Sequence, residues 1–190
     1  MNTNILVDKL PTTYKGLKVN TNFRSFILFE LLMQDNEIPK EEKVYLALNL
    51  FYKEEIKDVK TAIDGIMWIY CMGNIRKENK NIKKKENKNT INNIYSYEYD
   101  AEYIYGAFWH DYRLDLSELD YLHWWKFKSL FDSLNEGNKI CQIMSYRAVD
   151  LNKIKNEDEK KKYRKLKQIW ALPDNRTEKE KENDFAEALW

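Results

Sequence analysis

The chain has 190 residues, of which 43% are hydrophobic, so it is long enough and apolar enough to form a folded domain with its own core. Its 32 basic and 31 acidic residues leave a formal net charge of +1, which excludes a strong overall attraction to nucleic acid or to an acidic membrane surface. Five glycines and three prolines are few for a chain of strands and tight turns, and this scarcity favours long helices with short connections.

A small β-hairpin is expected at the N-terminus. Two β-prone runs, residues 5–7 and 17–19, flank a segment that contains Pro11 and Gly16. Both of these residue types favour turns.

Three helices are expected over residues 20–73. Asn22, or either of the two residues before it, can cap the first helix. Pro39 suits the first turn of the second helix, because its missing N–H would have no partner there. The third helix is expected from about Glu54, with Gly73 as its C-terminal cap. Apolar residues recur three and four positions apart, as on helices that bury one face: Phe23, Phe26, Ile27 and Leu31, then Val44, Ala47, Leu48 and Phe51, then Ile56, Val59, Ile63, Ile66 and Tyr70.

Residues 74–93 differ sharply in composition. They contain seven Asn and seven Lys or Arg, with three isoleucines as their apolar side chains. Burial of so little apolar surface cannot offset a backbone ordering entropy of roughly 1–2 kcal/mol per residue. We expect a mobile Lys/Asn-rich loop. Contact of its positive charge with RNA or an acidic partner is the weaker interpretation, because no aromatic side chain interrupts it to stack on bases.

Four further helices are expected over residues 94–173. Asp100 can cap the first, and Ser117 with Asp120 forms a capping-box-like start for the second, which is expected to continue to residue 134. A shorter helix is expected over residues 138–150. The last begins at Asn156, and its acidic residues lead while its basic residues trail, as the helix dipole favours.

Residues 174–190 are expected to form a charged tail that can be helical and can await a partner. Its apolar side chains gather near the end, at Phe185, Leu189 and Trp190.

The stretch YLHWWKFKSLF, residues 121–131, lies inside the helix expected over residues 116–134. At about 100° per residue, one face of this helix is apolar and is expected to face the core: Leu116, Leu119, His123, Phe127, Leu130, Phe131 and Leu134, with Trp124 at its margin. On this face His123 is expected to be a neutral, hydrogen-bonded structural residue. Tyr121, Trp125 and Lys128 lie away from it, and Tyr121 and Trp125 are the main candidates for a protein interface, because Trp and Tyr are enriched in interfaces. The alternative is that the N-terminal helices cover them.

The sequence contains no recognisable catalytic or metal-binding motif. His110 and His123 are the two histidines, and neither belongs to an HExxH or a Cys–His arrangement. The five glycines never cluster as in a phosphate-binding loop. Cys71 and Cys141 form no CxxC pair and are expected to be reduced core thiols. We therefore expect no enzyme activity, no cofactor and no metal.

These elements predict a mostly α protein that contacts no membrane. Residues 1–173 are expected to form one compact domain of about six to eight helices with a small N-terminal β-hairpin. Its two halves, residues 20–73 and 94–173, are expected to be joined by a flexible loop over residues 74–93. No apolar run approaches the roughly 20 residues that span a bilayer, and the N-terminus lacks the regions of a signal peptide.

Four stretches carry a resemblance to a known family: KVNTNFRSFILFE, YSYEYDAEYIYGAFWHDYRLDLSELDYLHWWKFKSLFDSL, RAVDLNKIK and LKQIWALP. In this order they resemble the bacteriophage gene-product-fifteen family of long-tailed phages and prophages of low-GC Gram-positive bacteria, over about residues 10–173. At the position of Arg113 that family usually has glycine, and a helix-ending turn with positive φ there would strain a side chain. The most specific part is a core motif, which here includes Asp100, Ile104, Phe108, His123, Trp124, Phe127 and Phe131.

The resemblance implies a role in tail morphogenesis. Such proteins are encoded between the tail tube and tape measure genes, the position of tail assembly chaperones. The implied partners are the tape measure protein, tail tube subunits and further copies of the chain. The implied location is the host cytoplasm, with the protein absent from the mature virion. The alternatives are a structural component that stays in the tail and, as the least favoured, a nucleic-acid-binding regulator that uses residues 76–88 and 160–167.

Overall fold

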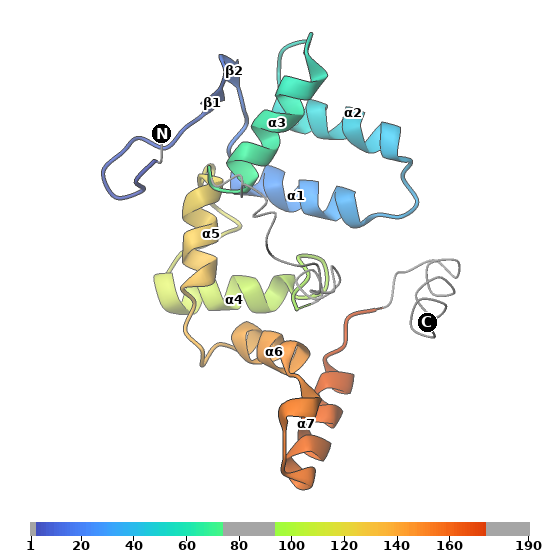
Figure 1. Ribbon diagram of the computed structural model, residues 1–190. Helices are drawn as coiled ribbons and strands as arrows, with labels where there is room; N and C mark the ends of the chain where they lie inside the picture. Colours follow the sequence, from blue (N-terminus) through green and yellow to red (C-terminus); the bar gives the residue numbers. More distant parts are fainter. Residues whose placement is uncertain (1–2, 74–93, 174–190) are drawn as a thin grey trace, which may run out of the picture.

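The computed structural model describes residues 3–73 and 94–173 (Figure 1). The described part contains seven α-helices, one short 3₁₀ helix and one two-stranded antiparallel sheet, so the expected mostly α fold is confirmed. The expected loop 74–93 and tail 174–190 lie outside the described residues. In chain order the elements are β1 (Thr13–Tyr14), β2 (Leu17–Lys18), α1 (Phe23–Gln34), α2 (Lys40–Phe51), α3 (Val59–Tyr70), α4 (Ala101–Tyr112), α5 (Trp124–Asp132), α6 (Lys139–Ala148), η1 (Leu151–Lys153) and α7 (Glu157–Ile169).

The hairpin is confirmed, but its first strand lies later than expected. β1 and β2 pair across Lys15 and Gly16, whose φ angles of 46° and 86° suit a tight hairpin turn. Residues 5–7 form a turn instead of a strand. The side chain of Asn4 accepts the N–H of Leu6 at 3.0 Å, and the side chain of Asp8 accepts the N–H of Asn4 at 2.7 Å. In a strand, such N–H groups would bond to a neighbouring strand instead.

Polar caps define most of the helix starts. The side chains of Asn22, Asp58 and Asn156 each accept a backbone N–H in the first turn of α1, α3 and α7. Asn22 and Asn156 confirm the predicted starts. Helix α3 begins after Asp58 and not near Glu54, because the side chain of Asp58 accepts the N–H of Thr61 and so caps the helix at this position. Pro39 occupies the cap position of α2, one residue before the expected place.

Helix α5 is shorter than expected, because it begins at Trp124 and not at Ser117. Its N-cap is His123, whose Nδ1 accepts a backbone N–H of the first turn at 3.1 Å. Three backbone carbonyls between residues 116 and 119 accept hydrogen bonds from the guanidinium of Arg24 in α1. These hydrogen bonds hold residues 116–119 in a loop, where a helix had been expected.

A core of stacked aromatic rings joins the two halves of the chain. Trp124 of α5 stacks on Phe26 of α1, with ring centroids 5.0 Å apart, and on Tyr70 of α3 at 5.8 Å. One turn later, Phe127 stacks on Phe108 of α4 at 5.1 Å. Such ring pairs contribute roughly 0.5–1.5 kcal/mol each beyond their burial. Helix α5 therefore connects the N-terminal helices to α4 (Figure 1).

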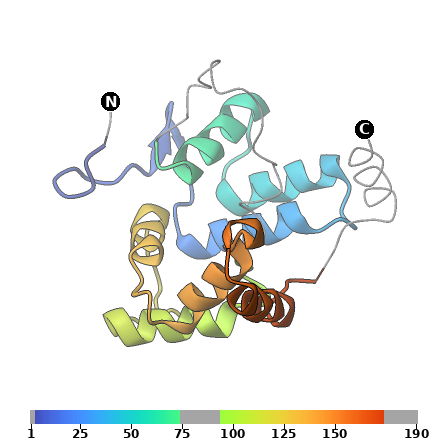
Figure 2. The same cartoon turned by 60° about the horizontal axis from the view of Figure 1, so that its bottom comes forward.

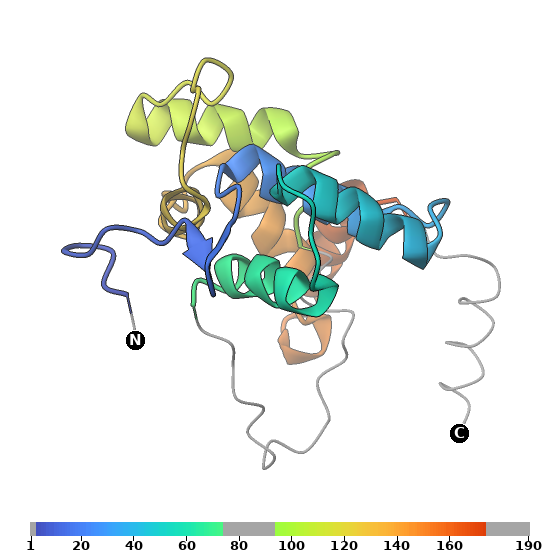
Figure 3. The same ribbon diagram turned by 90° about the horizontal axis from the view of Figure 1, so that it is seen from above.

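Helices α4 and α7 lie at the edge of the molecule. α4 borders the described part of the molecule in the views of Figures 2 and 3, and its side chains Tyr105 and Trp109 are exposed there. α7 contacts α6 and η1, and none of its residues is fully buried within the described part of the chain.

Candidate protein interaction surfaces

The structure buries the core motif. Each of its seven residues is at most 5% exposed: Asp100, Ile104, Phe108, His123, Trp124, Phe127 and Phe131. These side chains build the interior, so a surface that binds a partner has to lie elsewhere.

His123 is buried and makes structural hydrogen bonds, as predicted from its position in the helical pattern. Its Nε2 lies 3.0 Å from the carbonyl oxygen of Pro11, and its Nδ1 accepts the N–H of Trp125. A neutral imidazole that is protonated at Nε2 satisfies both contacts. Burial lowers the pKa of His123, and the nearby positive charge of Lys126 also lowers it. The ring ties the N-terminal arm to the start of α5.

Asp100 and Arg147 form a buried ion pair that was not expected from the sequence. The guanidinium donates to both carboxylate oxygens of Asp100, at 2.5 and 3.0 Å. It also donates to the backbone carbonyls of Ile94 and Trp170. Asp100 in turn accepts the N–H of Ser96 at 2.9 Å and makes no cap bond to α4, contrary to its expected role. The pair fastens the start of α4, the end of α6 and the end of α7 to one another.

Trp125 is not a surface residue, so its selection as an interface candidate was wrong. It is 2% exposed, its indole N–H donates to the carbonyl of Ile69 at 2.7 Å, and its ring lies 5.8 Å from that of Trp68. A Cβ at Gly73 would meet this ring at 3.3 Å. Helix α3 therefore covers Trp125, which was the alternative interpretation.

Tyr121 and Lys128 keep exposed surface. Tyr121 is 53% exposed, and its hydroxyl shares a hydrogen bond of 2.7 Å with the hydroxyl of Thr21. The Lys128 ammonium donates to Asp132 at 2.8 Å. The other three candidates lie outside the described residues: Phe185, Leu189 and Trp190.

A cavity of about 280 Å³ lies beside Lys128, between α1, α3 and α5. At its wall the hydroxyl of Tyr70 donates to the carboxylate of Glu30 at 3.0 Å. Burial raises the pKa of Glu30, and the bond from Tyr70 and the charge of Lys128 offset this in part.

No group of three or more His, Cys, Asp or Glu residues that could hold a metal ion occurs in residues 3–73 and 94–173.

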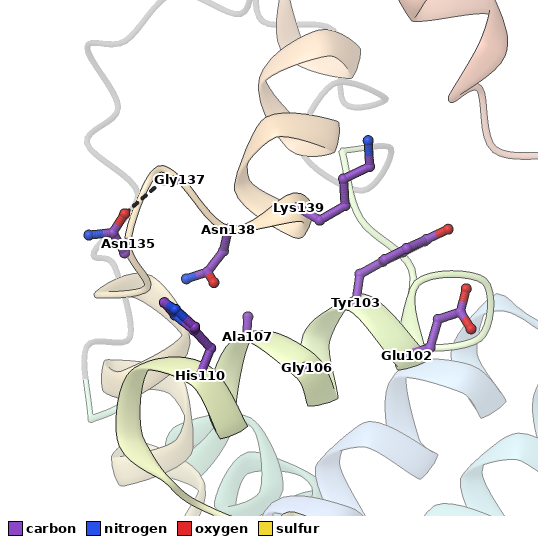
Figure 4. A pocket seen from close by; sticks show the side chains of 9 residues that line it. All are labelled: Glu102, Tyr103, Gly106, Ala107, His110, Asn135, Gly137, Asn138 and Lys139. Atoms are coloured by element: carbon purple, nitrogen blue, oxygen red, sulfur yellow. Dashed lines mark hydrogen bonds between the residues drawn. The ribbon is translucent and has the colours of Figure 1, made fainter.

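A groove of about 440 Å³ lies between α4 and the start of α6 (Figure 4). Gly106 and Ala107 form its floor, and Tyr103 and His110 rise from α4 on either side of them. The opposite wall consists of polar residues from the segment before α6 and its first turn: Asn135, Asn138 and Lys139.

The N-terminal arm carries the most exposed large apolar side chains described. Leu6 is 87% exposed and Val7 is 78% exposed. The turn that presents them is closed by hydrogen bonds between Asn4 and Asp8, and the arm extends away from the helices in Figure 1. The sequence pattern did not identify this surface, because the same β-prone residues suggested a strand.

The described helices do not combine the length and the apolar character that a membrane crossing requires; the longest has 13 residues.

Neither a curated protein nor a solved structure matches the chain significantly. The family model described as "Bacteriophage Gp15 protein" matches residues 6–172, which is most of the chain and includes both histidines, the buried ion pair and all the described helices. The chain therefore belongs to the Bacteriophage Gp15 protein family.

Proposed function

We propose that this phage protein is a tail assembly chaperone that binds the tape measure protein, and with it tail tube subunits, during tail morphogenesis. The observation that carries the proposal is the exposure of Leu6 and Val7 on a turn that side-chain hydrogen bonds hold in place. Large aliphatic side chains held out in water favour an apolar partner that covers them. Membership of a phage protein family supports the proposal.

The chemistry of this turn favours a partner with an elongated apolar surface. Full burial of a leucine or a valine side chain contributes roughly 1.5–3 kcal/mol. The net charge of +1 adds no overall electrostatic attraction. A long helical protein with an apolar stripe, as expected for a tape measure protein, fits these requirements. Tyr121, with its exposed ring, is a second contact candidate.

Copurification with the tape measure protein tests this proposal. The wild-type chain is coexpressed with a tagged tape measure protein and is expected to copurify with it. The double variant Leu6→Ser, Val7→Ser is expected to lose most of this binding, because the exposed side chains supply the apolar contact. Ile169→Ser, which changes an aliphatic residue that is 63% exposed on α7, is the matched control. Equal recovery of all three proteins would contradict the proposed contact.

The same proposal locates the protein in the host cytoplasm during assembly and not in the finished particle. Mass spectrometry of purified virions is expected to find tube and tape measure proteins without stoichiometric amounts of this chain. Its presence in fixed proportion to the tube protein would favour the structural alternative.

A further inference from the structure

The open face of α4 carries large aromatic and charged side chains. Tyr105 is 38% exposed, Trp109 is 46% exposed, and the side chain of His110 is 74% exposed. Gly106 and Glu102 lie on the same face, one and two turns before Trp109 and His110, as the helical period requires. Among the described residues, these side chains keep solvent-exposed surface on this face.

No neighbour in the described part of the chain requires glycine at position 106. It lies in the middle of α4, where glycine lowers helix stability relative to alanine. A Cβ built at this position meets no atom within 4 Å. The described residues therefore leave space above the helix backbone at Gly106, next to the groove of Figure 4.

Arg113 is a second unexplained feature at the end of the same helix. It caps α4 in the left-handed region, with φ at 53°, where glycine is favoured and a side chain is strained. Its side chain is exposed, and no hydrogen bond or ion pair joins its guanidinium to another described residue. The strain is therefore not offset by a contact of this side chain within the described chain.

We propose that a second copy of this chain packs antiparallel against the open face of α4. In this arrangement Trp109 of one copy lies over Gly106 of the other, so the indole fills the space that the missing Cβ leaves. The same register places Glu102 opposite Arg113, which pairs a carboxylate with a guanidinium.

The register follows from the positions along the helix. The pairs 106 and 109, 105 and 110, and 102 and 113 share one midpoint, so an antiparallel two-fold axis through that midpoint brings all three pairs together. The pair 105 and 110 puts the ring of Tyr105 against that of His110 of the other copy. Each contact then occurs twice, as in other isologous dimers. The groove beside Gly106 and Ala107 gives the incoming indole room toward Tyr103 (Figure 4).

This self-association uses residues other than the Leu6 and Val7 turn, so it goes beyond the proposed function. Failure of one proposal leaves the other intact. A variant on α4 is expected to leave copurification with the tape measure protein unchanged.

Sedimentation velocity of the full chain over a wide range of concentrations tests the proposal. The wild-type protein is expected to show a monomer–dimer equilibrium. Gly106→Gln is expected to be monomeric at the same concentrations, because its side chain occupies the place of Trp109 from the second copy. Its melting temperature is expected to be unchanged or higher, since glutamine is the better helix former and its Cβ meets no described atom within 4 Å. A wild-type protein that stays monomeric throughout, or a Gly106→Gln variant that dimerises like wild type, would overturn the proposal.

Two further variants test the contacts. Trp109→Ala is expected to raise the dimer dissociation constant about tenfold or more, as a central interface tryptophan does. Tyr45→Ala, which removes an aromatic side chain that is 65% exposed on α2, is the matched control and is expected to leave the constant unchanged. If both variants dimerise equally well, Trp109 is not at the interface and the proposal is wrong.

A charge exchange tests the register. Glu102→Arg is expected to weaken the dimer by like-charge repulsion, and the combination Glu102→Arg, Arg113→Glu is expected to restore it. A double variant no better than Glu102→Arg alone would overturn the antiparallel arrangement.

Discussion

At the level of single residues, polar side chains inside this protein join segments that are distant in sequence. His123 is 3% exposed and uses both ring nitrogens, one toward Pro11 and one toward the backbone of α5. Its inward direction could be predicted from helical spacing. Its role as an N-cap could not, because the sequence also offered Ser117 with Asp120 as a start for the helix.

The buried neutral state of His123 predicts a loss of stability in weak acid. Its folded-state pKa is lowered by burial, so as pH falls the unfolded chain takes up the proton first. The contribution of His123 is complete above the unfolded value of 6.5 and is lost as pH falls from there toward the folded-state pKa. The raised pKa of Glu30 acts oppositely, because its contribution is complete below 4.5 and is lost as pH rises through the folded-state value.

The variant His123→Asn isolates this effect, because asparagine retains a capping oxygen but does not titrate. Urea denaturation at several pH values is expected to show that the free energy of unfolding of wild type falls more steeply than that of the variant below pH 6.5. Parallel curves would mean that His123 is not buried in its neutral form.

Arg113 predicts a gain of stability on substitution by glycine. The left-handed conformation of Arg113 at φ 53° is strained by a side chain and is readily adopted by glycine. We expect Arg113→Gly to raise the free energy of unfolding of the monomer by about 0.5–1 kcal/mol, measured by denaturation at low protein concentration. Arg113→Ala, which keeps a Cβ, is the matched control and is expected to gain little. Equal stability of Arg113→Gly and wild type would contradict the strain.

At the level of elements, α5 shows what periodicity can and cannot predict. The helical period correctly placed Trp124, Phe127 and Phe131 toward the core, even though α5 begins later than expected. The same projection left Trp125 on an outer face. Periodicity describes one helix and cannot reveal that a second layer, α3, covers its other side. Similarly, Arg24 and Arg147 could not be recognised, since their partners lie about 50 to 90 residues away along the chain.

Burial of Trp125 predicts a loss of fold stability rather than a loss of binding alone. We expect Trp125→Ala to lower the free energy of unfolding by about 3–5 kcal/mol, because it leaves a cavity between α5 and α3 and removes the hydrogen bond to the carbonyl of Ile69. Chemical denaturation followed by circular dichroism measures this. Tyr121→Phe is expected to lose only about 1 kcal/mol, the value of its single hydroxyl bond. If Trp125→Ala were as stable as Tyr121→Phe, the indole would have to be exposed.

The ion pair of Asp100 and Arg147 predicts strong coupling between α4, α6 and α7. Arg147→Met is expected to lower the free energy of unfolding by about 3–5 kcal/mol, because it leaves the carboxylate of Asp100 buried without its partner. The double variant Asp100→Leu, Arg147→Met removes both charges and is expected to be more stable than Arg147→Met alone. A double variant whose losses simply add would contradict the coupling.

At the level of the whole molecule, the mostly helical fold follows from composition and spacing, whereas its surfaces do not. Few glycines and prolines, together with apolar residues at helical intervals, were sufficient to predict a mostly α fold with a small hairpin. Exposure depends on packing between elements. For that reason the turn at Leu6 and Val7 and the open face of α4 became visible only in the structure.

The proposed tail assembly role is tested most directly by the solubility of the tape measure protein. The tape measure gene is expressed in bacteria with and without this chain, and its product is measured in the soluble and insoluble fractions. A chaperone is expected to move most of the tape measure protein into the soluble fraction, and Leu6→Ser, Val7→Ser is expected to reverse this while Ile169→Ser does not. A tape measure protein that is equally soluble with and without this chain would contradict the proposed function.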